Sequence, residues 1–364
     1  MHITLVGQYD PSQESPGGIE VYLSGLHKYL EKREIDTSVL GWSRTKTARQ
    51  GFIPVMTSKE MRGLIYALLL FFKAPFLKIS QDSLIHVQRP DHVIPFLFRK
   101  NKIILTLHGA HIENVRLKKG RIAVFLYEII QSIAFRRADA VISVSERHMN
   151  YFSGRYPGLK DKTVVIPPGV DPIFTPTDRV AARKKLGLPE DGKILVFIGR
   201  LEKEKRVDLL IEKSPGQKRY TLLIVGEGRE REHLMKLARG HEQVIFIGAV
   251  RHNTVPDLIN CADALVLMSI HEGMPTVILE SLACGVPVLC TDVGDVKNVV
   301  SEGKTGYIVT PDNFAEKIEE LLESKANYRE QGTAVARAYS WENIGPRIVG
   351  VYHKAEDGEF GLRK

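Results

Sequence analysis

Short apolar runs separated by helix-length segments constrain the fold of this chain most. They form two series, one on each side of residue 167. The runs lie at 3–6, 84–87, 103–107, 140–144 and 163–166, and then at 194–198, 222–225, 244–247, 264–267, 286–289 and 307–309. Nearly continuous apolar strands that alternate with helices are typical of parallel sheets covered on both faces. The sequence therefore predicts two doubly wound α/β domains.

The segment 167–178 separates the two series. It contains four prolines and neither a long apolar run nor a helical pattern, which is typical of a linker. A chain of 364 residues with 43% hydrophobic content is long enough for two domains with cores of their own. We expect the domains to cover residues 1–168 and 169–343.

The location of the protein is predicted from features that the sequence lacks. No apolar run approaches the roughly 18 residues that a membrane-spanning helix needs. The first seven residues contain no basic stretch, so they indicate a buried strand and not a signal peptide. Cys261, Cys284 and Cys290 are odd in number and lie in apolar contexts, which favours core thiols in a reducing compartment. We expect a cytoplasmic protein.

The net charge of +8 is unevenly distributed. Up to Arg179 there are 25 Lys and Arg against 16 Asp and Glu, whereas the remainder has 26 against 27. A basic half indicates nucleic acid, an anionic membrane surface or an acidic substrate as a partner, or only a solubility requirement. Stacking aromatics and nucleic-acid-binding motifs are missing, which argues against nucleic acid.

Two carboxylates, Glu272 and Glu280, carry most of the functional information. Pro275 is suited to the start of a helix, and Gly285 with Pro287 is expected to end it after roughly three turns. This places Glu272 on the loop before the helix and Glu280 inside it. Because helix N-termini attract phosphate, carboxylates on either side of one can hold the hydroxyl groups that flank a diphosphate. This geometry suits a nucleotide sugar.

A glutamate inside a helix is also commonly a solvated surface residue. The apolar neighbours of Glu280, which are Val277, Ile278, Leu279, Leu282 and Ala283, argue that it is at least partly buried. A buried carboxylate needs a partner, and the ribose hydroxyls of a nucleotide are one.

From Glu272 to Glu280 the chain resembles the Glu-x7-Glu signature of the retaining glycosyltransferases of family 4. The resemblance extends over nearly the whole chain through a series of short motifs in the same order. They are Pro16–Glu20, Thr106–Gly109, Ala138–Ser145, Ile166–Asp171, Gly199–Leu201 with Lys205, Val225–Gly228, Cys284–Asp295 and Tyr339–Glu342.

The resemblance implies the GT-B fold, in which two Rossmann-like domains face each other across a cleft. It implies that the first domain binds the acceptor and the second the nucleotide-sugar donor. It also implies that a final helix, residues 344–364, returns to the first domain. Retention in this family is ascribed to attack of the acceptor on the same face of the sugar, so that no carboxylate nucleophile is needed.

The resemblance also assigns roles in donor binding. Glu280 is expected to hold ribose, while Glu272 and the backbone of Gly273, Met274, Pro275 and Thr276 contact the sugar. Many relatives have Gly-Phe-Gly where this chain has Gly273-Met274-Pro275, and a proline cannot donate an N–H group. The sugar contact at Pro275 is therefore the point at which this chain departs from the family.

Arg200 and Lys205 match the positions that clamp the diphosphate in the family. They follow the strand 194–198, and open α/β sheets bind ligands at such strand ends. Arg200 can bind two phosphate oxygens and Lys205 can supply a mobile charge. Without the resemblance, a solvated run of charges is the better explanation of these residues.

The first domain contributes three further candidates. Gly17 and Gly18 precede a helix and let the backbone approach a phosphate closely, although a bare Gly-Gly is not the full dinucleotide-binding motif. In the family this loop closes on the diphosphate. His108 ends the strand 103–107. By resemblance it contacts the donor sugar, where it positions and stabilises charge, whereas a purely structural hydrogen-bonding role is the alternative.

The sequence contains no compact metal-binding constellation, and Asp292 and Asp295 are expected to be turn and cap residues. We expect neither a metal nor another cofactor. Arg, Lys and a helix N-terminus would instead neutralise the leaving diphosphate. Among enzymes, a GT-B-like sugar-nucleotide epimerase or a phosphorylase is the alternative to a transferase.

Two clusters of residues in the first half of the chain suggest what kind of acceptor the enzyme uses. Residues 59–78 combine Lys59, Arg62, Lys73 and Lys78 with the apolar block 64–72, and residues 116–121 add Lys118, Lys119 and Arg121. Basic and bulky apolar helices can lie in a membrane interface. The sequence thus suggests reversible docking on the cytoplasmic leaflet and a lipid-linked or otherwise anionic acceptor, or else an apolar block that packs inside the domain.

Overall fold

The computed structural model describes residues 1–10, 17–43, 51–58, 63–109, 120–213 and 219–360. The chain divides into two compact units. Unit 1 comprises Met1–Gly169 with Trp341–Lys364, and unit 2 comprises Val170–Ser340. The division between Gly169 and Val170 lies inside the segment expected to be a linker. The last helix begins at Trp341, three residues before the predicted return to the first domain.

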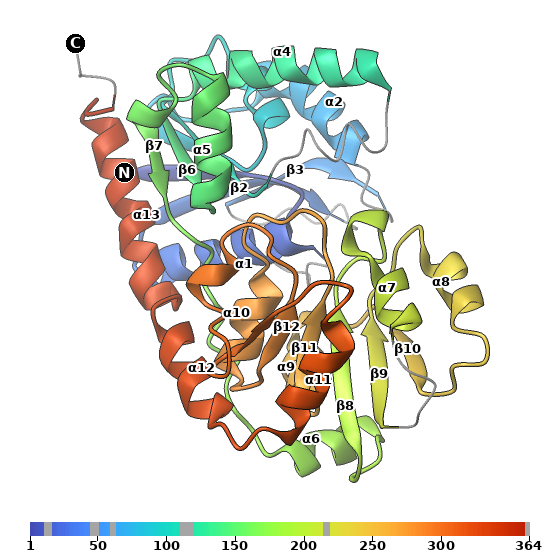
Figure 1. Ribbon diagram of the computed structural model, residues 1–364. Coiled ribbons are helices and arrows are strands. Elements are labelled where there is room, and N and C mark those ends of the chain that lie inside the picture. Colours follow the sequence, from blue (N-terminus) through green and yellow to red (C-terminus); the bar gives the residue numbers. More distant parts are fainter. Residues whose placement is uncertain (11–16, 44–50, 59–62, 110–119, 214–218, 361–364) are drawn as a thin grey trace. The chain divides into compact units, whose positions relative to one another are not determined.

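Unit 1 is built on a seven-stranded parallel sheet with the order β3-β2-β1-β4-β5-β6-β7 (Figure 1). The strands are β1 His2–Val6, β2 Asp36–Ser43, β3 Phe52–Thr57, β4 Ser83–Val87, β5 Ile103–Leu107, β6 Ala140–Ser143 and β7 Thr163–Val165. The strand order reverses between β1 and β4, which makes the carboxyl ends of these two strands the topological switch point of this sheet.

The strands β2 and β3 were not predicted from the sequence. The first three residues of β2 are Asp36, Thr37 and Ser38, so its apolar part is short, and Pro54 interrupts β3. β3 is at the edge of the sheet, where a residue that lacks a backbone donor is tolerated. Both strands therefore lack the apolar runs that indicated the others.

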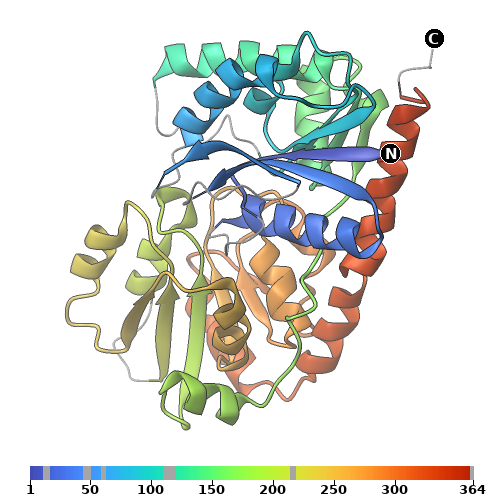
Figure 2. The same ribbon diagram turned by 180° about the vertical axis from the view of Figure 1, so that it is seen from behind.

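The helices of unit 1 cover both faces of this sheet. They are α1 Gly18–Lys32, α2 Gly63–Lys73, α4 Arg121–Arg137, α5 Glu146–Arg155 and α13 Trp341–Glu356, with the short 3-10 helices η1 Ala74–Phe76, η2 Pro90–His92, η3 Ile94–Phe96 and η4 Lys160–Lys162. One core joins the sheet to α1 and α13, and another joins it to α2, α4 and α5. Figures 1 and 2 show α2 and α4 together on the face opposite α1.

The helices α1 and α13 pack by reciprocal insertion of aromatic rings at glycines. A methyl group on Gly25 of α1 would lie 2.3 Å from the Trp341 ring of α13. Conversely, one on Gly345 of α13 would lie 2.3 Å from the Tyr29 ring of α1. The two glycines therefore allow close helix packing, which makes α13 an integral part of unit 1 despite its distance in sequence.

Unit 2 contains a six-stranded parallel sheet with the order β10-β9-β8-β11-β12-β13. The strands are β8 Lys193–Ile198, β9 Tyr220–Val225, β10 Val244–Gly248, β11 Ala264–Leu267, β12 Val288–Cys290 and β13 Gly306–Ile308. The helices are α6 Arg179–Leu186, α7 Val207–Glu212, α8 Arg231–Leu237, α9 Val255–Asn260, α10 Thr276–Ala283, α11 Phe314–Glu323 and α12 Tyr328–Arg337, with η5 Lys203–Lys205, η6 His252–Thr254 and η7 Val296–Asn298.

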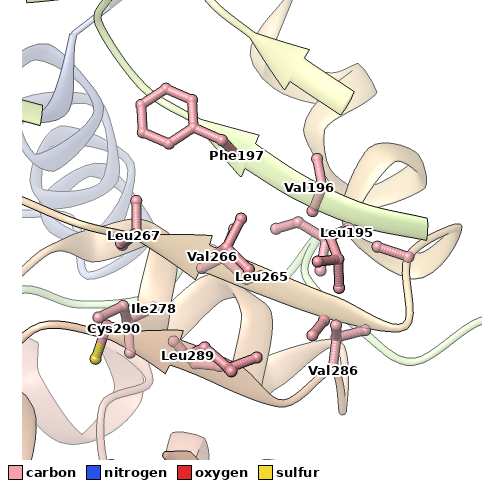
Figure 3. Packing of buried hydrophobic residues seen from close by; sticks show 14 of the residues in the cluster. Leu195, Val196, Phe197, Leu265, Val266, Leu267, Ile278, Val286, Leu289 and Cys290 are labelled. Carbon is pink, nitrogen blue, oxygen red and sulfur yellow. The ribbon is translucent and has the colours of Figure 1, made fainter. Parts of the chain in front are cut away.

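One continuous hydrophobic core joins these elements. Figure 3 shows the side chains of β8, β11 and β12 packed with Ile278 of α10. The three cysteines belong to this core, as predicted. Burial raises the pKa of each thiol to about 12.

The structure corrects two element boundaries in unit 2. The strand predicted at 286–289 is β12 at Val288–Cys290, after Pro287. The helix expected to run for three turns is the eight-residue α10, which makes little more than two. Gly285 follows it with a φ of +73°, the left-handed conformation that ends a helix.

Candidate active site

In unit 2 the strand order reverses between β8 and β11. The crevice outside the carboxyl ends of such strands is the usual ligand site of an open α/β sheet. The loop after β8 carries Arg200 and Lys205, and the loop after β11 carries Glu272 and leads into α10. The sheet topology thus brings residues from two distant motifs to one place.

Lys205 and Glu272 form an ion pair at this switch point. The Lys205 Nζ donates to Glu272 Oε1, and both side chains are mostly buried, with 16% and 15% of their surface exposed. The Ser269 hydroxyl donates to the same carboxylate oxygen at 2.8 Å. Lys205 was expected to bind phosphate and Glu272 the sugar, and their contact with each other was not predicted.

Arg200 lies in the same loop as Lys205 and is accessible. Its side chain is 58% exposed, and its Nη2 is 3.5 Å from Glu204 Oε1. The Glu204 backbone oxygen also accepts a hydrogen bond from Ile270 N, at 2.8 Å, in the loop after β11. The guanidinium therefore retains exposed donors, whereas Lys205 is held in place by Glu272.

Glycines allow the loops around Arg200 to approach closely. Gly226 has a φ of +137°, and a methyl group on it would lie 1.9 Å from Gly199 O. A methyl group on Gly228 would lie 2.1 Å from Leu201 O. The motif Val225–Gly228 thus supports the loop that carries Arg200.

The loop before α10 is equally constrained. Pro275 occupies the N-cap position of α10, and Gly273, Met274 and Pro275 are buried. Gly294 faces this loop: with a φ of +52°, it has no room for a methyl group, which would lie 1.7 Å from Gly273 O. The first N–H groups of α10, beginning at Thr276, have no intrahelical acceptor, so the loop presents a helix N-terminus next to Glu272.

Glu280 lies one turn into α10 and is 7% exposed, in agreement with its apolar sequence context. Burial raises the pKa of its carboxyl group to about 8, and the charge of Asp171 raises it as well, while a hydrogen bond with Thr276 opposes the shift. This carboxyl group is therefore largely protonated near neutral pH.

The candidates of unit 1 lie at the carboxyl ends of its strands. His108 follows β5, and its Nε2 is 2.8 Å from Gln88 Oε1, just after β4. The His108 ring also meets the Tyr22 ring of α1 edge to face, with 4.7 Å between centroids. The ring is thereby positioned from two sides.

Gly17 and Gly18 begin α1, the helix that carries Tyr22. Gly17 is the N-cap residue in an extended conformation, and a methyl group on Gly18 would meet no atom within 4 Å. Pro16 and the loop before it lie outside the described residues. The start of α1 therefore presents an accessible backbone in the same unit as His108.

The predicted site residues divide between the units. Gly17, Gly18 and His108 belong to unit 1, and all the others belong to unit 2. Sequence reasoning missed Ser269, Glu204, Gln88 and Tyr22, which position the predicted residues. For Ser269 and Gln88 the signal was present, because each is the first polar residue after an apolar strand.

Among the described residues, no group of three or more His, Cys, Asp or Glu side chains is placed to bind a metal ion. Asp292 pairs with Lys297 at 2.7 Å, and Asp295 is the N-cap residue of η7. Likewise, none of the described helices is long and apolar enough to cross a membrane.

Two family models match this chain, one over each of its two units. The family model "Glycosyltransferase Family 4" matches residues 16–174, and the model "Glycosyl transferases group 1" matches residues 178–338. The chain belongs to glycosyltransferase family 4. It is 32% identical to D-inositol 3-phosphate glycosyltransferase of Actinosynnema mirum over 243 residues, which are 60% of this chain and 58% of that relative. The chain covers 53% to 62% of the length of this and the two next relatives.

Solved structures establish the fold as GT-B. Sucrose-phosphate synthase from Thermosynechococcus elongatus has a TM-score of 0.83 and 21% identity, covering 97% of this chain and 98% of that one. Anabaena HepE in complex with UDP-glucose has a TM-score of 0.76 and 20% identity, covering 97% of this chain and all of that one. At these identities the likeness concerns the fold.

Proposed function

We propose that this protein is a retaining glycosyltransferase that moves a sugar from a nucleotide diphosphate to an acceptor hydroxyl in glycan or glycolipid synthesis. One observation carries the proposal: at the switch point of unit 2, Lys205, Glu272 and exposed Arg200 stand beside the N-terminus of α10, with buried Glu280 one turn further. Cations and a helix N-terminus suit a diphosphate, and the two carboxyl groups suit hydroxyls.

The residues of unit 2 are assigned to the donor. Glu280 holds the ribose hydroxyls, and Arg200 with Lys205 binds the diphosphate. Glu272 and the backbone from Gly273 through Met274 and Pro275 to Thr276 contact the sugar. Because Lys205 already neutralises Glu272, we propose that the pair acts as one unit whose carboxylate accepts sugar hydroxyls while its ammonium reaches the diphosphate.

The reaction needs no carboxylate nucleophile in this proposal. The acceptor oxygen bonds to the anomeric carbon on the face from which the diphosphate leaves, and the bond from that carbon to the phosphate oxygen breaks. A β-phosphate oxygen takes the acceptor proton. Arg200, Lys205 and the helix N-terminus stabilise the departing charge, and we therefore propose activity without a metal ion.

The residues of unit 1 complete the assignment. His108 positions and stabilises charge at the reacting sugar, and Gly17 and Gly18 bring the start of α1 to the diphosphate. The acceptor, lipid-linked or otherwise anionic, binds mainly to unit 1 at the cytoplasmic face of the membrane. The relation to an enzyme named for inositol 3-phosphate supports an anionic acceptor, and the fold likeness to a protein crystallised with UDP-glucose supports a UDP- or GDP-sugar as donor.

A thermal-shift panel of UDP-, GDP- and ADP-sugars tests the donor assignment. A ligand at 100 times its dissociation constant stabilises the folded state by about 2.7 kcal/mol. We expect one nucleotide to do so in wild type and to lose this effect in Glu280→Gln. The same nucleotide should support transfer in EDTA, and an absolute need for Mg²⁺ or Mn²⁺ would remove the metal-independent step.

Product analysis separates the transferase from its alternatives. We expect the new glycosidic bond to have the same anomeric configuration, α or β, as the sugar in the donor. Conversion of the donor without any acceptor would instead indicate a sugar-nucleotide epimerase, and dependence on free phosphate would indicate a phosphorylase. No shift with any nucleotide sugar would overturn the proposal.

A further inference from the structure

Two helices of unit 1 expose apolar side chains to solvent. In α4 these are Ile122, Phe125, Leu126, Ile129 and Ile133, which are 38% to 78% exposed. In α2 and η1 they are Ile65, Leu68, Phe71, Phe72 and Phe76, which are 38% to 87% exposed. Spacings of three and four residues place each set along one side of its helix. Both helices are therefore apolar on the outside as well as on the side packed against the sheet.

The two sets lie on neighbouring helices. Both α2 and α4 pack against η2 and η3, and Figures 1 and 2 show the two helices side by side. Phe98, just after η3, is fully exposed. We call these eleven residues the apolar face. They make up eleven of the nineteen exposed large hydrophobic side chains of the described residues. Monomeric soluble proteins rarely expose contiguous apolar patches larger than a few hundred Å².

Basic residues accompany the apolar face. Of the nine Lys and Arg in the described residues 63–109 and 120–137, three pair with Asp91 or Asp139. Lys78, Lys100, Arg121 and Arg136 are exposed, and the only carboxylate of the described parts of α2 and α4, Glu128, is paired with Arg155. The surface therefore combines bulky apolar groups with an excess of positive charge.

These observations refine the expectation from sequence. Within the block 64–72, Tyr66 and Leu70 are buried, whereas Leu68, Phe71 and Phe72 are exposed, so the block both packs inside the unit and faces outward. Lys59, Arg62, Lys118 and Lys119 lie outside the described residues. The largely apolar helix expected after Arg121 is α4, and Phe98 is a further exposed apolar residue that the sequence did not indicate.

We infer that the apolar face inserts into the interfacial region of an anionic bilayer. Aromatic and aliphatic side chains flanked by Lys and Arg are the composition of helices that lie in a membrane interface, and anionic lipid attracts such cations. A second copy of the chain is a poorer occupant, because a symmetric contact would bring two basic surfaces together. The inference deepens the proposed function, on which it rests for the role of the lipid, by placing the enzyme where a lipid-linked acceptor lies.

Vesicle co-sedimentation tests the inference with matched variants of the full chain. The face variant carries Phe72→Ser, Phe76→Ser and Phe125→Ser. Its control carries Met235→Ser, Ile245→Ser and Ile247→Ser, at exposed apolar positions of unit 2. With vesicles of phosphatidylcholine and phosphatidylglycerol, we expect wild type and control to sediment and the face variant to lose binding at least about tenfold.

A second pair of variants tests the charge. We expect Lys78→Gln with Arg121→Gln to weaken binding to the same vesicles by about fivefold for each cation removed. The control, Lys236→Gln with Arg239→Gln in unit 2, should bind like wild type. High salt should weaken binding of all of them, and vesicles of phosphatidylcholine alone should bind little.

Several outcomes would overturn the inference. They are equal sedimentation with neutral and anionic vesicles, no sedimentation with either, or equal losses in the face variant and its control. A wild-type dimer that the face variant converts to a monomer in sedimentation velocity would instead assign the surface to self-association. Nucleotide-dependent thermal stabilisation is measured on the same samples. Its presence without vesicle binding contradicts only the membrane inference, and its absence with vesicle binding contradicts only the proposed donor site.

Discussion

The protonation of Glu280 links its position to stability. Burial raises the pKa of this carboxyl group from 4.5 to about 8. Between these values the folded protein binds more protons than the unfolded chain. The contribution to stability is thus largest below about pH 4.5 and decreases as the pH rises toward 8. Ionisation of this buried carboxyl group therefore destabilises the folded state as the pH rises.

We predict that Glu280→Gln is more stable than wild type at pH 8, because the amide does not ionise. The difference should be small near pH 5 and grow by up to about 1.4 kcal/mol per pH unit above it. Urea unfolding of both proteins at pH 5 and pH 8 measures it. Parallel pH profiles of the two proteins would contradict the burial of an ionisable carboxyl group at this position.

The affinity for the nucleotide should depend on pH in the opposite direction from the stability of the folded protein. A ribose hydroxyl donates best to the ionised carboxylate, so the affinity of wild type should rise with pH up to about 8 and binding should release protons. Glu280→Gln should bind more weakly, with little dependence on pH. Calorimetric titration in buffers of different ionisation enthalpy measures the proton release. Unaltered affinity in the variant would remove the ribose assignment.

The pair of Lys205 and Glu272 is expected to behave as a coupled unit. Lys205→Ala and Glu272→Ala should each lower turnover, roughly 10²-fold or more for Lys205, on the scale of losing one charge-stabilising donor. Each should also destabilise unit 2, since the remaining mostly buried charge loses its partner. The double variant should be more stable than additivity predicts.

Arg200→Ala provides the matched comparison for this pair. Its side chain is exposed, so we expect a similar loss of turnover with little change in the free energy of unfolding. Urea unfolding and initial-rate measurements on the four variants distinguish the cases. Strict additivity of the two changes in stability would show that the ion pair contributes nothing.

At the scale of elements, the regular apolar strands were predictable and the exceptions have physical reasons. All six strands of unit 2 were located from their apolar runs, because a parallel sheet covered on both faces needs them. β2 was missed because it begins with polar residues such as Asp36, and β3 was missed because an edge strand tolerates Pro54. The site was predictable where a motif marked it. The contact of Lys205 with Glu272 was not, since it depends on the adjacency of β8 and β11, which no local pattern encodes.

The reciprocal packing of α1 and α13 gives a prediction within one helix. Gly345 accommodates the buried ring of Tyr29, whereas a methyl group on Gly350 would meet no atom within 4 Å. Gly345→Ala should destabilise unit 1 by roughly 1–3 kcal/mol through overpacking. Gly350→Ala should stabilise it by roughly 0.5–1 kcal/mol, because alanine is the better helix former. Urea unfolding that showed the same sign for both would contradict this packing.

For the whole molecule, the two units have separate cores, and this makes them distinguishable by spectroscopy. Both tryptophans, Trp42 and Trp341, are buried in unit 1, and unit 2 contains none. Tryptophan fluorescence therefore reports the unfolding of unit 1 alone, while far-ultraviolet circular dichroism reports both units. Gly345→Ala should lower the urea midpoint of the transition seen by fluorescence. A second transition with a higher midpoint should then remain, and only circular dichroism should detect it.

The nucleotide should act on the other unit. The proposed ribose and diphosphate residues, Glu280, Arg200 and Lys205, all belong to unit 2. A nucleoside diphosphate at 100 times its dissociation constant should therefore raise the free energy of unfolding of unit 2 by about 2.7 kcal/mol. This shifts the transition that only circular dichroism detects. The fluorescence transition should rise less, because unit 1 is assigned only the contact of the start of α1 with the diphosphate. Gly18→Ala, whose added methyl group meets nothing in the structure, serves as the test of unit 1. If both transitions rise together and Gly18→Ala cancels only the rise seen by fluorescence, the start of α1 also binds the diphosphate. A rise confined to the fluorescence transition would contradict the assignment of the donor to unit 2.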